Sequence, residues 1–475
     1  LKPIRSAWRA ALIVCLVSAP TAIAGDCEPQ WNHGIAGSGP VLPIPGSSGV
    51  TTSFIYDDGT GPALYIGGDF PSFNGIAGTQ GIARWDGEHW SSVGGGMAPG
   101  GRVEAFAVYD DGTGPALYVG GTFTDAGGVA NTSTIAKWDG ANWSPAQTVA
   151  SLNGTVYDLE VATLDEAEGP RLYAGGYLSG TTAVSKLNLS TGVWQTVGGT
   201  NNGGYVLDLQ QYTENGNPYL YAAGSFTTMN NSSGSNIARY NGTAWNTGGT
   251  GTNQFGVVHK MHVHNDGTGP SLYAGGLFTT IGGIPASKIA KRTPTGWQSL
   301  AGGIGGPQPC PTCQVVCWAM ATFDDGTGPA LYVAGNFSQV DGQSIYRFAK
   351  WDGATWSAVG TGPGGPGQEP APVIRDMIAF NGCGGLAPGA PEALFMVGKF
   401  DLMNGVDNRS VAQLSACSGG LLGDLNGNGT VDLPDLNLVL ANFGQNTSAG
   451  DINGDCMVNL VDLNLLLANF GNFEG

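Results

Sequence analysis

The last part of the chain holds two copies of a run of oxygen-bearing side chains that could bind a hard cation. The run GDLNGNGTVDLPDLNLVLANFG at 423–444 returns 27 residues later as GDINGDCMVNLVDLNLLLANFG at 450–471. Aspartate and asparagine alternate with other residues at the start of each copy, a spacing that places several oxygen ligands around one Ca²⁺ ion. The expected ligands are Asp424, Asn426, Asn428, the Thr430 carbonyl, Asp432 and Asp435 in the first copy, and Asp451, Asn453, Asp455, the Met457 carbonyl, Asn459 and Asp462 in the second. The sequence therefore predicts two calcium sites.

This duplication resembles the type I dockerin, whose half-EF-hand loops carry Asp at position 12 and are each followed by one helix. The resemblance implies a small all-α calcium-binding domain at 421–475, with helices at 436–443 and 463–470 that end at Gly444 and Gly471. The second loop has Cys456 where the first has the sharp-turn Gly429.

Dockerins bind cohesins through loop positions 10 and 11, so the resemblance implies a cohesin-like or other cell-surface anchoring partner. Those positions are apolar here, Leu433-Pro434 and Leu460-Val461, rather than Ser-Thr. Packing of the module against the rest of the chain is the alternative.

A second group of residues could support acid–base chemistry. Glu160, Asp208 and Asp376 are expected on one face of the strands that open successive repeats, together with Lys260. Carboxylates that converge in a channel could hold a cation, or act as general acid and base on a glycan. Paired or solvated charges are the alternative interpretation.

The chain has one histidine cluster, His259, His262 and His264. On a strand, His262 and His264 share a face and His259 points to the other. This arrangement disfavours a three-histidine metal site.

Repeats define the elements that must position these residues. DDGTGPALYIGGDF at 57–70 returns at 110–123, 265–278 and 324–337, with degenerate copies at 168–178, 217–226 and 392–400. The aromatic anchors of the seven units are Tyr65, Tyr118, Tyr173, Tyr221, Tyr273, Tyr332 and Phe395. Each unit has apolar strand segments, the DGTGP turn and an Asp-Gly hairpin signal. Four antiparallel strands repeated radially predict an all-β seven-bladed propeller over 25–420, and the Gly pair and Trp of each unit resemble the Kelch repeat.

The fourth-strand tryptophan indicates how the ring closes. It occurs at 90, 143, 194, 245, 297 and 356, and the seventh unit ends after its third strand at 411–414. We expect Trp31 to supply the missing strand from the N-terminal end. Cys27 and Cys417 would then lie where the other blades have their last hairpin turn, which predicts a disulfide between them; a Cys417–Cys456 bridge is the rival. Disulfides are favoured for the remaining cysteines, whose pairing stays open: Cys310, Cys313, Cys317, Cys383 and Cys456. Seven cysteines follow residue 24, and this odd number means that at least one is free or forms an intermolecular bond.

Two further repeated features are expected to be structural. The third strands carry a basic residue at the same place: Arg84, Lys137, Lys186, Arg239, Lys291 and Lys350. Its recurrence favours a salt bridge or an exposed stripe over a site. The acids of the DDGTGP segments, such as Asp57 and Asp58, are expected to stabilise turns.

Residues 1–24 have the pattern of a secretory signal peptide, with Lys2, Arg5 and Arg9 before the apolar run 10–19 and small residues at 22–24. No later segment is apolar for long enough to span a bilayer. The formal charge of -18 and the absence of a basic run exclude nucleic acid as a partner.

We therefore expect a secreted or cell-surface protein whose propeller binds a polysaccharide or a protein, attached through a calcium-dependent module. The alternative is a carbohydrate-active enzyme, a glycoside hydrolase or lyase of the propeller type, because dockerins commonly accompany polysaccharide degradation. The chain has no G-x-S-x-G, phosphate-loop or H-E-x-x-H motif.

Overall fold

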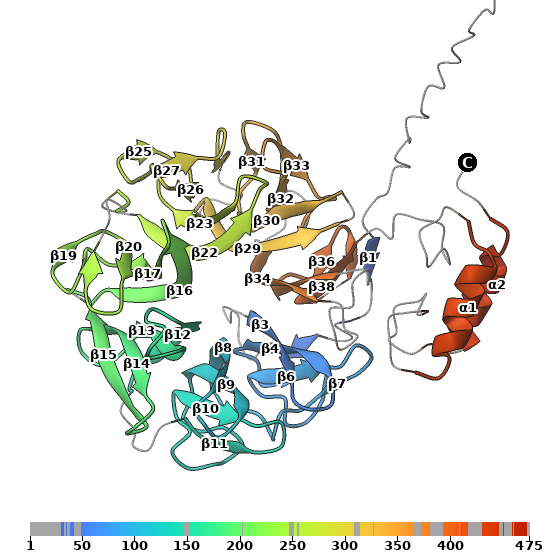
Figure 1. The fold of residues 1–475 in the computed structure, drawn as a ribbon, viewed down its shortest axis with the longest axis horizontal. Helices are drawn as coiled ribbons and strands as arrows, with labels where there is room; N and C mark the ends of the chain where they lie inside the picture. Colours follow the sequence, from blue (N-terminus) through green and yellow to red (C-terminus); the bar gives the residue numbers. More distant parts are fainter. Residues whose placement is uncertain are drawn as a thin grey trace, which may run out of the picture.

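A computed structural model describes residues 30–32, 35, 39–41, 49–146, 152–201, 203–246, 251–253, 256–307, 314–325, 327–364, 372–380, 393–407, 409–416, 430–445, 450, 458 and 460–472. Seven four-stranded antiparallel sheets form a ring, the predicted seven-bladed propeller (Figure 1). The first strand of each sheet lies nearest the centre of the ring.

The blades follow one another in chain order. Blades one to three are β3 (Val50–Asp57), β4 (Pro62–Gly68), β6 (Ile82–Trp85) and β7 (Trp90–Ser91); β8 (Arg102–Asp110), β9 (Pro115–Thr122), β10 (Ile135–Trp138) and β11 (Trp143–Pro145); and β12 (Thr155–Ala162), β13 (Arg171–Tyr177), β14 (Thr182–Asn188) and β15 (Val193–Gly199). Blades four and five are β16 (Tyr205–Glu214), β17 (Asn217–Ser225), β20 (Ile237–Tyr240) and β21 (Trp245–Asn246); and β22 (Val257–Asn265), β23 (Pro270–Leu277), β26 (Ile289–Thr293) and β27 (Gly296–Ser299). Blades six and seven are β29 (Val316–Asp324), β30 (Pro329–Asn336), β32 (Phe348–Trp351) and β33 (Trp356–Ala358); and β34 (Val373–Phe380), β35 (Ala393–Lys399), β38 (Val411–Ser415) and β1 (Gln30–Asn32).

The N-terminal strand closes the ring, as predicted. β1 pairs antiparallel with β38 and becomes the outer strand of blade seven. The chain that follows β1 then contacts blade one, where the indole Nε1 of Trp90 donates to the Ile35 carbonyl at 2.5 Å. The same contact joins blades one and two, where Trp143 Nε1 donates to the Val93 carbonyl at 3.2 Å. The closing strand therefore reproduces a contact that an uninterrupted pair of blades makes.

Short ladders tie most blades to the segment that leads into them. β2 (Pro40–Val41) pairs with β5 (Ser72–Phe73) of blade one, and β28 (Ile304–Gly305) pairs with β31 (Gln339–Val340) of blade six. The remaining short strands are the hairpins β18 (Thr228–Met229) with β19 (Ser232–Ser233), β24 (Thr280–Ile281) with β25 (Ile284–Pro285), and β36 (Leu402–Met403) with β37 (Val406–Asp407).

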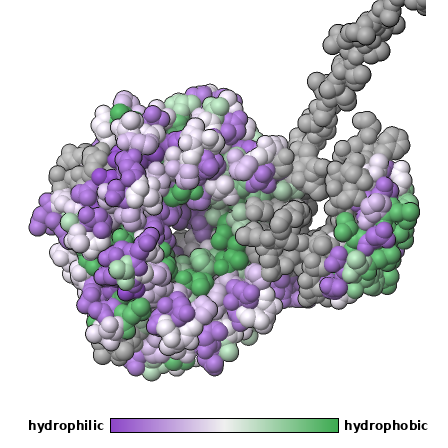
Figure 2. Space-filling model, viewed as in Figure 1, coloured by the Kyte–Doolittle hydropathy of each residue, from purple (hydrophilic) through white to green (hydrophobic). Residues whose placement is uncertain are grey.

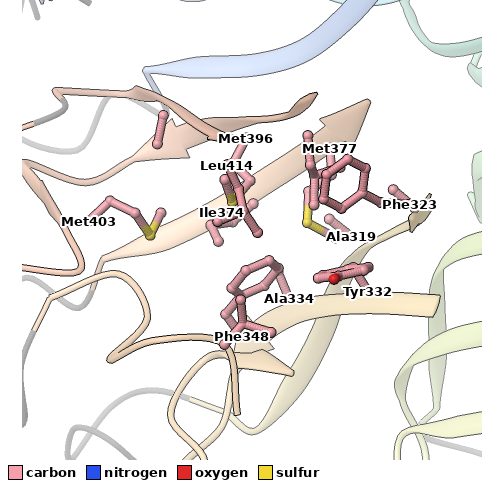
Figure 3. Packing of buried hydrophobic residues seen from close by; sticks show 14 of the residues in the cluster. Ala319, Phe323, Tyr332, Ala334, Phe348, Ile374, Met377, Met396, Met403 and Leu414 are labelled. Atoms are coloured by element: carbon pink, nitrogen blue, oxygen red, sulfur yellow. The ribbon is translucent and has the colours of Figure 1, made fainter. Parts of the chain in front are cut away.

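The core lies between neighbouring blades. Figure 3 shows one such layer, in which Tyr332 and Phe348 of blade six pack against Ile374, Met377 and Met396 of blade seven. Apolar side chains of the second strands are almost wholly removed from water in every blade. At about 25 cal/mol per Å² of buried apolar area, these layers are the main source of stability.

The repeated acids, tyrosines and bases form one structural motif, as the sequence predicts for the acids and bases. In blade two, the Tyr118 hydroxyl donates to Asp111 at 2.8 Å, and Lys137 Nζ lies 2.9 Å from the same carboxylate. Equivalent groups in other blades are Tyr65, Asp58 and Arg84; Tyr221, Glu214 and Arg239; Tyr273, Asp266 and Lys291; and Tyr332, Asp325 and Lys350. Each turn is thereby fixed to the second and third strands of its own blade.

Two helices follow the ring in the chain, α1 (Leu433–Asn442) and α2 (Leu460–Asn469). Each helix begins three residues before its predicted start. In α1, Asp432 is the N-cap, and the helix runs from the residue that follows it. Gly444 and Gly471, both with positive φ, follow the helix ends in the predicted role. Their N–H groups donate to the Val458 and Val431 carbonyls, so each copy closes on the other.

Candidate functional site

All seven inner strands have a register shift at the same place. The ladder with the second strand skips one residue between Val50 and Thr52 in blade one, and between Val258 and Lys260 in blade five. The skipped residues in blade order are Thr51, Glu104, Tyr157, Leu207, His259, Trp318 and Arg375. A β-bulge inserts one residue and bends its strand, so it re-aims the side chains at that point.

A glycine of the second strand makes room for each bulge. A Cβ on Gly121 would clash with the Arg102 carbonyl, and a Cβ on Gly276 would clash with the Val257 carbonyl. The same close approach occurs in every blade, at Gly68, Gly121, Gly176, Gly224, Gly276, Gly335 and Gly398. The glycine that ends LYxxG, or LFxxG in blade seven, is therefore the sequence signal of the bulge.

The seven bulged residues surround one cavity at the centre of the ring, and we call them the bulge ring. The cavity has a volume of about 200 Å³, and Figure 2 shows the ring hollowed at its centre. Its lining consists of the bulge ring, the residues that follow several of the bulges, and Arg102. Side chains from all seven blades thus converge on one space.

The predicted carboxylates lie in and beside this cavity, and their oxygens reach to the next blade. Asp208 lines it and accepts the Met261 N–H at 2.8 Å, while Asp376 lines it and accepts the Ser53 N–H at 2.8 Å. Glu160 lies two residues beyond the cavity-lining position of its strand and accepts the Gln211 N–H at 2.8 Å.

The residue of blade three that matches Asp208 is Asp158, which the sequence reading missed. Asp158 lines the cavity and accepts the Leu209 N–H at 2.6 Å. The hairpin of blade three explains the difference: Tyr173 pairs with Glu160, whereas Tyr221 pairs with Gln210, so the chain between the paired positions is two residues longer in blade three. The distance from the tyrosine that reaches Asp208 in blade four therefore reaches Glu160 in blade three. Among the described residues, carboxylates of three blades each fasten one inner strand to the next.

Lys260 is the cation among these acids. Its Nζ lies 2.9 Å from Asp208, and the side chain is 32% exposed because it faces the cavity. Burial lowers the pKa of the Lys260 ammonium, but Asp208, Asp376 and Asp158 outweigh burial and raise it above its usual value. Burial and the neighbouring Asp208 raise the pKa of Asp158. Burial also raises the pKa of Glu160, to about 8.

Blades five to seven contribute a stacked trio to the wall. The His259 and Trp318 rings have centroids 4.1 Å apart, and the Arg375 guanidinium carbon lies 4.4 Å from the Trp318 centroid. Burial, together with the Arg375 charge, lowers the pKa of His259 to about 3. His259 is therefore neutral at pH 7, and Arg375 supplies the charge of the trio.

The other two histidines do not join His259. His262 Nε2 lies 2.9 Å and His264 Nδ1 lies 3.0 Å from the same Thr322 hydroxyl. Within the part of the chain that the structure describes, no group of three His, Cys, Asp or Glu side chains could hold a metal ion.

The C-terminal module retains two features that suit a cation. Asp435 and Asp462 are 0% exposed, and 421–475 contains no Lys, Arg or His. Buried carboxylates are stabilised by hydrogen bonds, by a paired cation or by a metal ion. Asp435 also accepts the Asp432 N–H at 2.9 Å, which places a predicted ligand at the start of α1. Outside the described residues lie the predicted ligands Asp424, Asn426, Asn428, Asp451, Asn453, Asp455, Met457 and Asn459.

The described residues include one cysteine, Cys317. Cys317 is a buried free thiol in the layer between blades five and six, which corrects the expectation of a disulfide at this position. A thiol there fills the space against Gly275 of the preceding blade. The signal segment 1–24 and the other cysteines of the predicted bridges, Cys27 and Cys417 included, lie outside the described residues.

No described helix is long and apolar enough to cross a membrane. No protein-family model matches the chain, and no curated protein matches it. Similar solved structures include BBS1N in complex with ARL6DN, with 13% identity, a TM-score of 0.43, and coverage of 82% of this chain and 97% of that one. An ancestral GH74 enzyme matches at 10% identity and TM-score 0.42, over 78% of this chain and 48% of its own. The extracellular domain of a hybrid two-component system from B. thetaiotaomicron matches at 12% identity and TM-score 0.28, over 78% of this chain and 51% of its own.

Proposed function

We propose that this chain is an exported binding protein, whose propeller holds its ligand at the centre of the ring and whose C-terminal module attaches it to a cell-surface or extracellular partner. The observation that carries the binding role is the state of the cavity wall. The carboxylates of Asp158, Asp208 and Asp376 accept hydrogen bonds from backbone N–H groups of the next blade, so they stabilise the ring. The side chains of Arg375 and His259 line the cavity and make no hydrogen bond to any described residue.

The attachment role rests on the C-terminal module, which we propose to be a calcium-dependent, dockerin-like domain. Besides the buried acids, the two copies expose equivalent apolar side chains: Leu433 at 63% and Leu460 at 64%, Leu440 and Leu467 at 52%, and Phe443 and Phe470 at 43%. Apolar side chains exposed in such a group suit docking to another protein. The proposed partner is a cohesin-like or other cell-surface anchoring protein.

Calcium is tested on the whole exported chain by calorimetry. We expect two bound Ca²⁺ ions, and loss of one in each of Asp435→Ala and Asp462→Ala, because each substitution removes a ligand and a charge from one loop. Glu166→Ala, at an exposed acid of blade three, is the matched control and should keep both ions. No calcium binding by the unmodified chain would refute the calcium-dependent module.

Attachment is tested by cell fractionation in the source organism. The exported chain should be retained on the cell surface and released by a chelator, and Leu433→Asp with Leu460→Asp should release it without a chelator. Retention that neither treatment changes would overturn attachment through this module.

A carbohydrate-active enzyme is the second candidate, and one observation favours it. Burial raises the pKa of Asp158, Glu160 and Asp208, so these neighbouring carboxyls hold a proton more readily than exposed ones, as a general acid must. Hydrolysis of a polysaccharide by the exported chain, abolished in Asp158→Asn and Asp208→Asn, would replace binding with catalysis. Binding without turnover supports the leading proposal.

A further inference from the structure

The cavity wall leaves one cation, Arg375, and two acids, Asp158 and Asp376, without an ion-pair partner among the described residues. Two pairs are complete: Arg102 with Glu104, and Lys260 with Asp208. The Arg375 guanidinium makes neither an ion pair nor a hydrogen bond there, and its polar contact is the face of Trp318. Asp376 accepts two bonds from Ser53 through Oδ2, at 2.8 and 2.9 Å, and its Oδ1 accepts none.

The bulge of blade seven brings these opposite charges to one place. Arg375 is the skipped residue and Asp376 follows it, and both line the cavity. In a regular strand, consecutive side chains point to opposite faces, so the inserted residue is what presents both to the same space. The neutral His259, also without a hydrogen bond in the described part, adds a further polar group on the other side of Trp318.

A partly buried guanidinium loses part of its hydration, and no hydrogen bond to a described residue replaces it at Arg375. A bound carboxylate would replace it, since guanidinium and carboxylate form strong, bidentate hydrogen bonds. Asp376 Oδ1 offers the complementary acceptor for a protonated amine. The two complete ion pairs contribute no net charge, and Asp158, whose pKa burial and Asp208 raise to about 7, is a further acid of the wall. Arg375 and Asp376 are therefore the opposite charges with which a ligand can pair.

From this arrangement we infer that the cavity binds a small zwitterion that carries one carboxylate and one protonated amine, of the α-amino acid class. The carboxylate contacts Arg375, and the amine contacts Asp376. The volume of about 200 Å³ is below the roughly 300–1,000 Å³ of drug-sized sites, which fits a ligand of this size. The inference rests on the proposed ligand-binding role of the ring.

Calorimetry on the whole exported chain tests the ligand class. The probes are the proteinogenic L-amino acids and, for each that binds, the 2-hydroxy acid and the primary amine with the same side chain. We expect the amino acid to bind at least about tenfold more tightly than either analogue, because each analogue leaves one charge of the wall unpaired. Equal affinity for the amino acid and its analogues would overturn the inference.

Two substitutions assign the contacts. Arg375→Gln should weaken amino acid binding at least about tenfold, whereas Arg171→Gln, at a cation outside the cavity, should leave it unchanged. Asp376→Asn keeps an acceptor for Ser53 and should abolish the preference for the amino acid over its 2-hydroxy acid.

A stability measurement separates a ligand contact from a structural role. The melting temperature of ligand-free Arg375→Gln should equal or exceed that of the unmodified protein, because the substitution removes a partly buried charge that has no ion-pair partner among the described residues. A lower melting temperature with unchanged affinity would make Arg375 structural and overturn the inference. Binding of a neutral glycan in the cavity, with no affinity for amino acids, would overturn the zwitterion but leave the proposed binding function intact.

Discussion

The hydroxyl of Tyr332 is expected to stabilise the ring through one buried, charge-assisted hydrogen bond. The Tyr332 side chain is 0% exposed, and its hydroxyl donates at 2.7 Å to Asp325, which is 5% exposed. Hydrogen bonds to charged groups contribute about 1.5–3 kcal/mol. Without the tyrosine hydroxyl, the Asp325 carboxylate retains two other contacts, with the Lys350 ammonium at 2.6 Å and the Thr327 hydroxyl at 2.7 Å. Tyr332→Phe should therefore lower the free energy of unfolding by about 1.5–2 kcal/mol, near the lower end of the range for hydrogen bonds to charged groups.

The chain contains a matched control for this substitution. Tyr173 occupies the same place in blade three and is 2% exposed, but its hydroxyl donates to none of the described residues. Tyr173→Phe should change the free energy of unfolding by less than about 0.5 kcal/mol. Urea unfolding followed by tryptophan fluorescence, with hydrogen exchange of the blade six amides, measures both variants. Equal effects of the two substitutions would refute the structural role assigned to the repeated motif.

The same bond has a defined pH dependence. Burial alone would raise the pKa of Asp325, but Lys350, Thr327 and Tyr332 together lower it below its usual value. A carboxyl with a lowered folded-state pKa contributes stability that is fully present above the unfolded-state value, near 3.9, and is lost as the pH falls through the folded-state value. The difference between Tyr332→Phe and the unmodified protein should thus be constant from pH 7 to about pH 5 and shrink below pH 4.

Three further substitutions test the architecture, each by urea unfolding. Trp31→Ala should destabilise the ring by roughly 2–4 kcal/mol, because the indole packs in the layer of blades six and seven; a change below about 0.5 kcal/mol would contradict closure by β1. Gly121→Ala should cost at least about 2 kcal/mol, because the new methyl meets the bulge carbonyl, whereas Gly305→Ala, with open space at its Cβ, should be neutral. Leu209→Ala, in the core, should lower the free energy of unfolding by about 2–5 kcal/mol. Leu207→Ala, in the cavity wall, should lower it by less than about 1 kcal/mol. Equal losses would show that the bulge does not turn Leu207 out of the core.

The ring was predictable because its determinants recur in the sequence. Seven aromatic anchors set the number of blades, and the missing seventh tryptophan placed Trp31 in the last blade. The Asp-Tyr-base motif was predictable for the same reason, since a turn that forms alike in every blade uses alike residues.

The cavity wall was not predictable from alternation alone. A strand read with a period of two has no place for an inserted residue, so a bulge moves every later residue to the opposite face in such a reading. Glu160 was grouped with Asp208 for a separate reason: the hairpin of blade three is two residues longer than that of blade four, so counting back from the tyrosine anchor stops short of Asp158. The recurring glycine of the second strand signals the bulge, because only a residue without Cβ permits the close approach of the carbonyl two residues before the bulged one.

Comparison of the seven blades with one another separates structural from functional positions. Where the fold needs a residue, the blades agree: the second glycine is present in all seven, and six have the aromatic anchor as tyrosine. At the bulge no two blades agree, since the residues are Thr51, Glu104, Tyr157, Leu207, His259, Trp318 and Arg375. The fold therefore fixes that the bulge faces the cavity and leaves the side chain free to differ. Under the proposed binding function, a cavity built from seven positions of this kind takes its chemistry from the ligand that its wall complements.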